Sequence, residues 1–246
     1  MLHVALLGML QTTALAAPTP PVPFAVGETF EYTGKWGLLH VTVAHARLAV
    51  EAVDTTRGVP TWRFSFRGHA AFLLFASNDT LTSWTRIDPF ESLRFEKRVN
   101  DTGFHRYDNF SIHPDSGTFI NVGDSAPRPT SPRPLDDVAF FYYLRTVPLE
   151  VDSTYRFNRY FDASKNPVVV HVIGRAICDL PDHRTMCLVL HPLVDEPHGM
   201  FNKDADARIW YTDDALRIPV AIETHMGGGT VRLTLSKIIE PPRHRP

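Results

Sequence analysis

The sequence has little of what marks a nucleic-acid-binding or membrane-spanning protein. Lys and Arg (25) nearly balance Asp and Glu (27) in the 246 residues, for a formal net charge of −2. Nucleic-acid binding needs a basic face, so we expect no nucleic-acid partner. No apolar run approaches the roughly 20 residues that a membrane-spanning helix requires. We therefore expect no transmembrane segment.

The signatures of common catalytic sites are also missing. The sequence has no HExxH or HxH pair and no GxSxG turn, and Gly227-Gly228-Gly229 lacks the strand-to-helix context of a phosphate loop and favours a hairpin tip. Two acidic doublets, Asp136-Asp137 and Asp213-Asp214, could serve a paired-carboxylate hydrolase if they met in a cleft. A helix start and a turn explain the same doublets. We expect no catalytic residue, metal or cofactor, and keep an Asp-dependent hydrolase as the least favoured hypothesis.

The N-terminus is typical of an exported protein. An apolar run from Val4 to Leu10 precedes Ala14-Leu15-Ala16, a small-x-small site of the signal peptidase kind, although Met1 to His3 carries no Lys or Arg. We predict a signal peptide over residues 1–16, cleaved after Ala16, and a periplasmic or otherwise exported protein. Residues 17–23 then form a Pro-rich N-terminal segment, and residues 24–246 form one β domain.

Cys178 and Cys187 are the only cysteines, and they flank a polar turn that contains Pro181. The β-branched and apolar flanks predict a hairpin with one cysteine on each arm. A disulfide can form if the register brings the two β-carbons together, and disulfides persist outside the cytoplasm. A slip of one residue would put the two side chains on opposite faces. The sequence leaves both alternatives open.

Strand patterns dominate the chain. In Trp62 to Arg67, aromatic residues alternate with polar ones, which is the period of a strand with one solvated face. Turn residues such as Arg57-Gly58 and Asp88-Pro89 separate successive segments. The pattern predicts a mainly β fold, a large curved antiparallel sheet or open β-barrel with one short helix. Further strands are predicted at Phe30–Trp36, Leu39–His45, Ala46–Val53, Thr80–Ile87, Leu93–Lys97, Phe104–Tyr107, Phe110–His113, Tyr155–Phe161, Val168–Ile177, Leu188–Leu190, Ile209–Thr212, Ile218–Thr224 and Val231–Ser236.

One segment interrupts the strands. Four prolines between Asp124 and Pro134 predict an extended linker that cannot enter the interior of a sheet. The next residues predict a helix from Asp137 to Arg145, with Asp136 as its N-cap and Asp137 in its first turn. Val138, Phe141, Tyr142 and Arg145 would share one side of it.

Several features, taken in order, resemble a known family. They are Phe30-Glu31-Tyr32 with Trp36-Gly37, Ser83 to Pro89 leading into Leu93 to Lys97, the predicted helix, Cys187 before His191-Pro192, and Ile209 to Asp214 running into Arg217 to Val220. Together they resemble the bacterial family of domain of unknown function 3108, over roughly Phe24 to Ile239. The resemblance implies an exported envelope protein with a large antiparallel, barrel-like sheet, and it implies no reaction. The linker and Cys178 are departures from the family pattern.

The excess of aromatic residues suggests two uses, since 16 Phe, 7 Tyr and 4 Trp can fill a β core or line a cavity. The favoured hypothesis is a non-enzymatic binding module in which a curved sheet, closed by the helix, holds an apolar or amphipathic ligand such as a lipid. In this hypothesis Arg145 pairs with an anionic head group of the ligand. The alternative is a structural or assembly factor of the cell envelope that acts through protein contacts. The proposed ligand-binding residues are Trp84, Phe141, Tyr142, Arg145 and Trp210.

Overall fold

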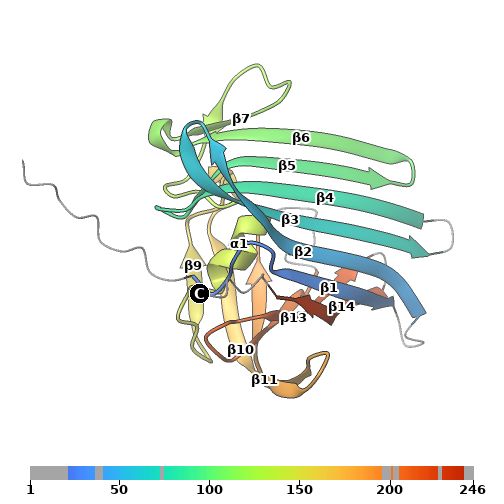
Figure 1. The fold of residues 1–246 in the computed structure, drawn as a ribbon. Helices are drawn as coiled ribbons and strands as arrows, with labels where there is room; N and C mark the ends of the chain where they lie inside the picture. The colour runs from blue at the N-terminus through green and yellow to red at the C-terminus, as the bar shows by residue number, and fades with distance from the viewer. Residues whose placement is uncertain are drawn as a thin grey trace, which may run out of the picture.

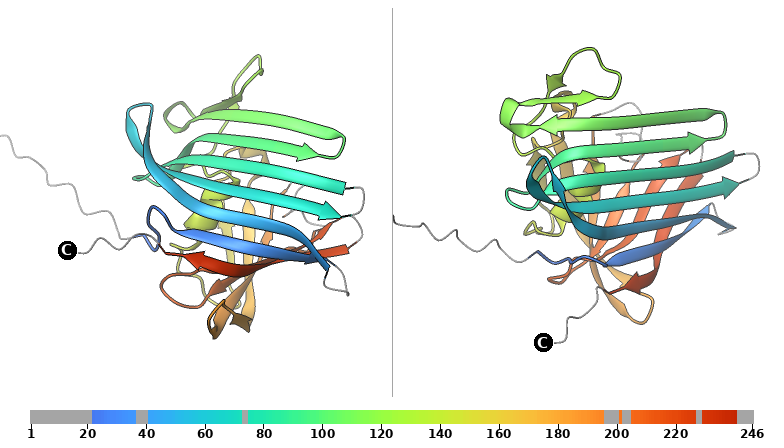
Figure 2. Two further views of the ribbon diagram at one scale, coloured as in Figure 1. Left: turned by 45° about the vertical axis from the view of Figure 1, so that its right-hand side comes forward. Right: turned by 45° about the horizontal axis from the view of Figure 1, so that its top comes forward.

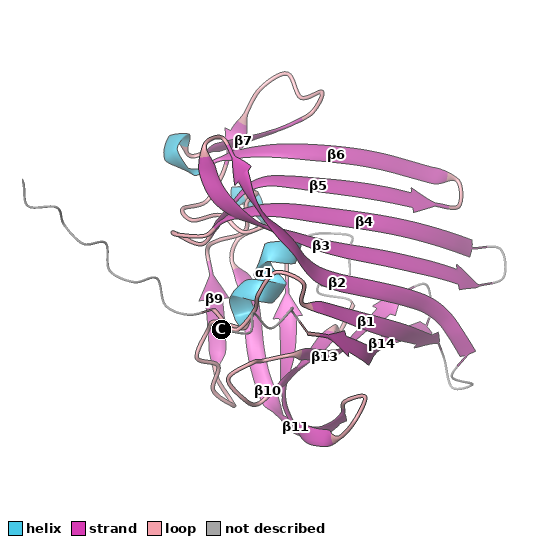
Figure 3. Ribbon diagram, viewed as in Figure 1, coloured by secondary structure: helices cyan, strands magenta, loops and turns pink. Residues whose placement is uncertain are grey.

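The computed structural model describes residues 22–36, 41–72, 75–195, 201, 205–226 and 229–240. The predicted signal peptide, most of the Pro-rich N-terminal segment, the start of the strand predicted at Leu39 and the Gly227-Gly228 pair lie outside the described residues. Strands dominate what is described, as Figure 3 shows.

The strands form one fourteen-stranded sheet in which every described pairing is antiparallel. Its strand order is β8-β7-β6-β5-β4-β3-β2-β1-β14-β13-β12-β11-β10-β9. The sheet curls so that β10 to β13 lie behind the long strands β2 to β6 (Figures 1 and 2). The predicted fold is confirmed: an open, curved antiparallel sheet. Its strands are β1 (Thr29–Trp36), β2 (Val41–Thr56), β3 (Val59–Phe72), β4 (Phe75–Arg86), β5 (Glu91–Asp101), β6 (Phe104–His113), β7 (Thr118–Asn121), β8 (Arg128–Pro129), β9 (Thr154–Phe157), β10 (Val168–Asp179), β11 (Arg184–Leu193), β12 (Arg208–Thr212), β13 (Pro219–Met226) and β14 (Gly229–Ile239).

Some strand boundaries differ from the prediction. The two strands predicted between Leu39 and Val53 are one strand, β2, and the two predicted between Phe104 and His113 are one strand, β6. A register shift opposite Gly34 and Lys35 marks a β-bulge in β2 between Thr42 and Ala44, inside the first of the two predicted strands. The second error has a cause in the sequence. Asp108 in the middle of β6 is typical of a turn, but here it is buried and accepts a hydrogen bond from Asn121.

The Pro-rich linker joins the two edges of the sheet. It contributes the two-residue edge strand β8, which agrees with the rule that proline stays out of sheet interiors. Beyond β8, Thr130 and Ser131 donate hydrogen bonds to the backbone carbonyls of Phe161 and Tyr160, which follow the other edge strand, β9. Leu135 forms a parallel bridge with Tyr160. The linker therefore connects the edges that the strand pairing leaves open.

The helix α1 (Asp137–Leu144) lies inside the curve of the sheet (Figure 1). A helix with one apolar side would leave its other side in water, but α1 is buried nearly all round, which is typical of an interior helix. On the side of α1 that was predicted to face the interior, Phe141 is only half-buried. Phe140 and Leu144, which lie on other sides, are buried, so burial is not confined to the predicted side. The buried residues of α1 are Val138, Ala139, Phe140, Tyr142 and Leu144.

The predicted hairpin is formed by β10 and β11, with one cysteine on each arm. Cys178 pairs with Thr185 and Cys187 with Ala176, so the two cysteines are diagonal neighbours on one face, with their Cα atoms 6.0 Å apart. They form a disulfide, and both are buried. Of the two alternatives that the sequence leaves open, the structure shows the bridge, in a diagonal arrangement instead of a directly opposite one.

Candidate functional site

The N-terminal end of α1 is anchored by a buried carboxylate. Asp136 is fully buried, and its Oδ1 accepts hydrogen bonds from the backbone N–H groups of Val138 and Ala139, as predicted for an N-cap. Its Oδ2 accepts a hydrogen bond of 2.6 Å from the Ser83 hydroxyl on β4. Burial raises the pKa of Asp136 to about 6, against these hydrogen bonds, which lower it.

The C-terminal end of α1 is anchored by a buried ion pair. Arg145 is 3% exposed and contacts both carboxylate oxygens of Glu28, at 2.5 and 3.0 Å. It also donates to the carbonyl oxygens of Pro23 and Leu216. Arg145 therefore ties the helix to the segment before β1 and to the turn before β13. Its hydrogen bonds are made within the protein, so the geometry offers no support for its predicted role as a partner of an anionic head group.

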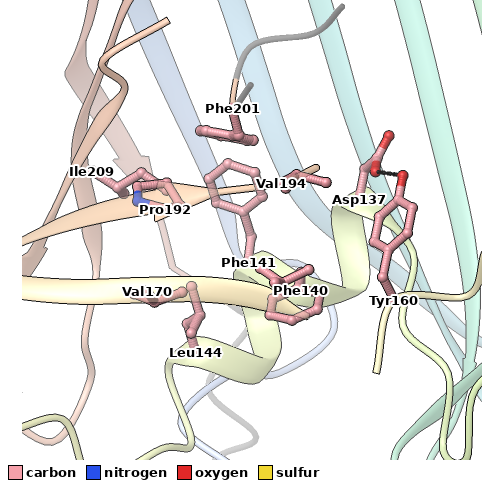
Figure 4. Close-up of a pocket in the computed structure, with 11 residues that line it drawn as sticks. Asp137, Phe140, Phe141, Leu144, Tyr160, Val170, Pro192, Val194, Phe201 and Ile209 are labelled. Carbon is pink, nitrogen blue, oxygen red and sulfur yellow. Dashed lines mark hydrogen bonds between the residues drawn. The ribbon is translucent and has the colours of Figure 1, made fainter. Parts of the chain in front are cut away.

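Between the two anchors, α1 borders an apolar pocket (Figure 4). Phe140, Phe141 and Leu144 form its helical wall, and side chains of β10 to β12 form the opposite wall. The ring centroids of Phe141 and Phe201 lie 5.8 Å apart, so Phe201 covers this side of the pocket. The pocket has a volume of about 50 Å³. The other lining residues are Asp137, Tyr160, Val168, Val170, Pro192, Val194 and Ile209.

One polar pair lies at the end of this pocket. The Tyr160 hydroxyl donates a hydrogen bond of 2.6 Å to Asp137 Oδ1, and Lys97 Nζ lies 3.9 Å from Asp137 Oδ2. The carboxylate of Asp137 is therefore already partnered, and the rest of the lining is apolar. The pocket can hold a hydrocarbon or ring by contact and exclusion of water, and it offers little for directional recognition.

The structure does not bring the five predicted ligand-binding residues together. Phe141 lines the pocket, whereas Tyr142, the next residue of α1, stacks on Phe64 of β3 with ring centroids 3.9 Å apart. Trp84 follows Ser83, whose hydroxyl reaches Asp136 inside, so alternation places Trp84 on the outer face of the sheet. There its Nε1 donates to Asp54, and the Arg94 guanidinium lies 4.4 Å from its ring.

Trp210 also faces away from α1. Its neighbours Ile209 and Tyr211 point inward, since Ile209 lines the pocket and the Tyr211 hydroxyl donates to the Phe141 carbonyl. The Arg232 guanidinium covers the Trp210 ring at 4.2 Å. Both tryptophans are therefore stacked under arginines on the outer face, and neither can contact a ligand in the pocket.

The acidic doublets have structural partners. Asp213 pairs with the Arg175 guanidinium at 2.6 Å, and Asp214 accepts hydrogen bonds from Thr212 and from two backbone N–H groups of the following turn. With Asp136 as a cap and Asp137 bound to Tyr160, the geometry offers no support for a paired-carboxylate hydrolase.

Among the residues that the structure describes, no three His, Cys, Asp or Glu side chains are placed to hold a metal ion. In the same ranges, no helix is long and apolar enough to span a membrane.

Most of the pocket lining was not predicted from the sequence. Tyr160 and Val194 lie in segments without a recognisable motif, and Phe201 lies in a connection between strands. The alternating apolar residues of β10, such as Val168 and Val170, identify an inward face. That signal is present in the sequence, but it does not distinguish a packed face from the wall of a pocket.

The fold and the pocket define the class as an open, barrel-like antiparallel sheet with a helix inside its curve. The chain belongs to the family "Protein of unknown function (DUF3108)", whose model matches residues 31–236. The resemblance noted in the sequence is thereby confirmed. A comparison with curated proteins found no match.

One solved structure supports the same class. The chain is similar to a "Beta-barrel-like Protein of Domain of Unknown Function DUF1849" from Brucella abortus, with a TM-score of 0.55 and 12% identity over 89% of this chain and 99% of that one. This likeness shows the fold alone. A "putative lipoprotein" from Parabacteroides distasonis matches at 10% identity (88% and 97% of the two chains), and a "putative exported protein with YmcC-like fold" from Bacteroides fragilis at 8% (89% and 98%). Both have a TM-score of 0.32, which is too low to carry an argument.

Proposed function

We propose that the protein is a non-enzymatic binding module of the cell envelope, and that the pocket beside α1 takes an apolar group of a larger, amphipathic ligand. The observation that carries the proposal is the lining of this pocket, which is almost entirely aliphatic and aromatic. A hydrocarbon group that enters such a pocket removes its own apolar surface and that of the wall from water, which favours binding. The predicted signal peptide supports a location outside the cytoplasm.

The volume of the pocket limits what enters it. Sites for whole small molecules usually measure about 300–1,000 Å³, whereas this pocket measures about 50 Å³. It therefore takes the end of a chain or one small apolar group, and the remainder of the ligand lies outside. Phe201 is the side chain that such a group would displace or contact first, because its ring packs at a tilt against Phe141 and both line the pocket.

The proposed function is tested with alkyl chains of known length. Wild-type protein purified without detergent is titrated with dodecanoic acid by calorimetry, and bound lipid is extracted and identified by mass spectrometry. Val170→Phe puts a ring into the pocket and is expected to weaken binding about tenfold or more, which corresponds to about 1.4 kcal/mol. Ile177→Phe is the matched control, since Ile177 lies on the same strand but is 62% exposed.

Thermal melting shows whether Val170→Phe is folded, and Val194→Phe is a second variant that fills the pocket from another segment. The proposal is wrong if wild-type protein reproducibly contains no lipid and does not bind dodecanoic acid. It is also wrong if folded pocket variants bind as well as Ile177→Phe does.

The small volume also favours a second function, an assembly factor that acts through protein contacts. The aromatic residues around α1 are packed against one another, as the Phe64 and Tyr142 stack shows, and a filled interior is what this function requires. Empty wild-type protein that copurifies stoichiometrically with one envelope protein would support it over the binding module.

A further inference from the structure

A second hollow lies on the outer face of the sheet, over β1 to β4, and it is polar. It has a volume of about 470 Å³, within the usual range for a small-molecule site. Its side chains alternate with the inward residues Leu48 and Phe66, so they face solvent and not α1. We call it the outer hollow; the outward side chains that line it are Glu31, His45, Arg47, Arg67, His69, Asn78, Thr80 and Ser236.

The register places two arginines and two histidines in the outer hollow. His45 on β2 lies directly opposite His69 on β3, and one step along the same face Arg47 lies directly opposite Arg67. Like charges directly opposite each other, such as those of Arg47 and Arg67, destabilise a pair of strands. Arg98 on β5 extends the same row, separated from Arg67 by Thr80. An arrangement that works against strand pairing suggests a use for the charge.

Neighbouring acids neutralise the two arginines only in part. The Glu51 carboxylate forms an ion pair with the Arg47 guanidinium at 2.9 Å, and it lies 3.7 Å from the Arg67 guanidinium. Burial raises the pKa of Glu51, but hydrogen bonds from Ser65 and Arg47 outweigh it and hold the pKa below its usual value, so this carboxylate is ionised and already engaged. Glu31 on β1 also lines the hollow, directly opposite Arg47 and 4.0 Å from Lys237, so it offsets part of the charge of Arg47 and none of the described ion pairs joins it to Arg67. Arg67 remains 62% exposed, with Glu51 as its one ion-pair partner among the described residues.

We propose that the outer hollow binds the phosphate group of a phosphate ester, with Arg67 and Arg47 as its principal ligands. Side chains directly opposite on neighbouring strands have Cβ atoms about 5 Å apart, so two guanidinium groups can reach oxygens of the same phosphate. Arginine forms paired N–H···O bonds with phosphate. His45, His69 and the Thr80 hydroxyl are placed to contact the rest of the ester. The site is independent of the pocket beside α1.

Calorimetry of the full chain tests the site with three probes: inorganic phosphate, glycerol 3-phosphate, and vesicles of phosphatidylglycerol compared with phosphatidylcholine. Arg67→Gln is expected to weaken binding about tenfold or more, as loss of a charged hydrogen bond does. Glu31→Gln removes a negative charge from the hollow and is expected to strengthen binding. Arg63→Gln is the matched control, because Arg63 lies on the same strand and pairs with Asp54.

The probes distinguish the sources of the phosphate. Binding of glycerol 3-phosphate that depends on Arg67 supports a soluble ester. Binding only to phosphatidylglycerol vesicles, weakened by Arg67→Gln and not by Arg63→Gln, supports a lipid head group. Absence of binding to all three probes overturns the proposal, and so does equal weakening by Arg67→Gln and Arg63→Gln, because this indicates nonspecific attraction by surface charge.

Discussion

The two sides of α1 meet the sheet differently. Towards β3, the interior is filled: Tyr142 stacks on Phe64 at 3.9 Å, and Phe24 packs against both rings. Towards β10 and β12, Phe141 and Leu144 border a gap. Close packing is what specifies one orientation of a helix, so the filled side positions α1, and the side with the gap contributes less to its position.

The polar groups of α1 form their hydrogen bonds at the ends of the helix and not on its filled side. The Tyr142 hydroxyl on the filled side has no hydrogen-bond partner among the described residues, and burial raises its pKa well above the usual value. The end anchors, Asp136 and Arg145, are satisfied by β4 and by the segment before β1. The helix α1 is therefore held by its ends and by one side, and its other side borders the pocket.

The largest effect is expected at the anchor formed by Arg145. Arg145→Met leaves the carboxylate of Glu28 buried and unpaired, and we expect the free energy of unfolding to fall by about 3–5 kcal/mol. Urea denaturation measures it. Arg175→Met, which breaks the half-exposed pair with Asp213, is the control and should cost about 1 kcal/mol or less. Equal effects of the two substitutions would contradict the role of Arg145 as an anchor.

An intermediate effect is expected at Asp136, and it depends on pH. The pKa is about 6 in the folded protein and about 3.9 in the unfolded chain. The folded state therefore binds the proton more tightly, and stability is greater below pH 4 and is lost as the pH rises through 6. The shift of about two units corresponds to about 3 kcal/mol. Denaturation from pH 4 to 7 measures this loss.

Asp136→Asn should remove this contribution to the pH dependence, because an amide can still cap the helix and does not ionise. Asp182→Asn, at an exposed position, should leave the pH profile unchanged. If Asp136→Asn has the same profile as the wild-type protein, the carboxylate is not the buried group that titrates.

The smallest effect tests the gap itself. Val170→Ile adds one methylene on the side of the pocket and should change the free energy of unfolding by about 0.5 kcal/mol or less. A methylene added to a filled core costs about 1–3 kcal/mol. Val50→Ile is the matched control, since Val50 is buried opposite Phe64 on the filled side. If both substitutions cost the same, the two sides of α1 are packed alike and the comparison fails.

Much of the fold could be predicted from local pattern. Alternation in Trp62 to Arg67 identified β3, and the position of Asp136 before Asp137 identified the start of α1. The edge strand β8 and its neighbour β7 were missed, because two to four residues carry too little pattern. The partner of Arg145 could not be predicted either, since Glu28 lies 117 residues away in the chain.

The candidate site was harder to predict than the fold. The sequence identified Phe141 as a residue of the site, but it grouped Trp84 and Trp210 with it because all three are aromatic. Alternation shows which residues share a face of one strand, but which face becomes the interior depends on how the sheet curls and where bulges shift it. Both tryptophans lie next to such shifts.

The sequence by itself determined the strand content, the helix with its cap, the hairpin that carries the cysteines and the family, because each depends on neighbouring residues or on a short spacing. Tertiary structure alone decided that Arg145 is an internal anchor, that the disulfide is diagonal, that a gap remains beside α1 and that arginines and histidines lie opposite one another in the outer hollow. These features depend on register and on contacts between distant segments. Such contacts form only when the whole sheet curves around its helix.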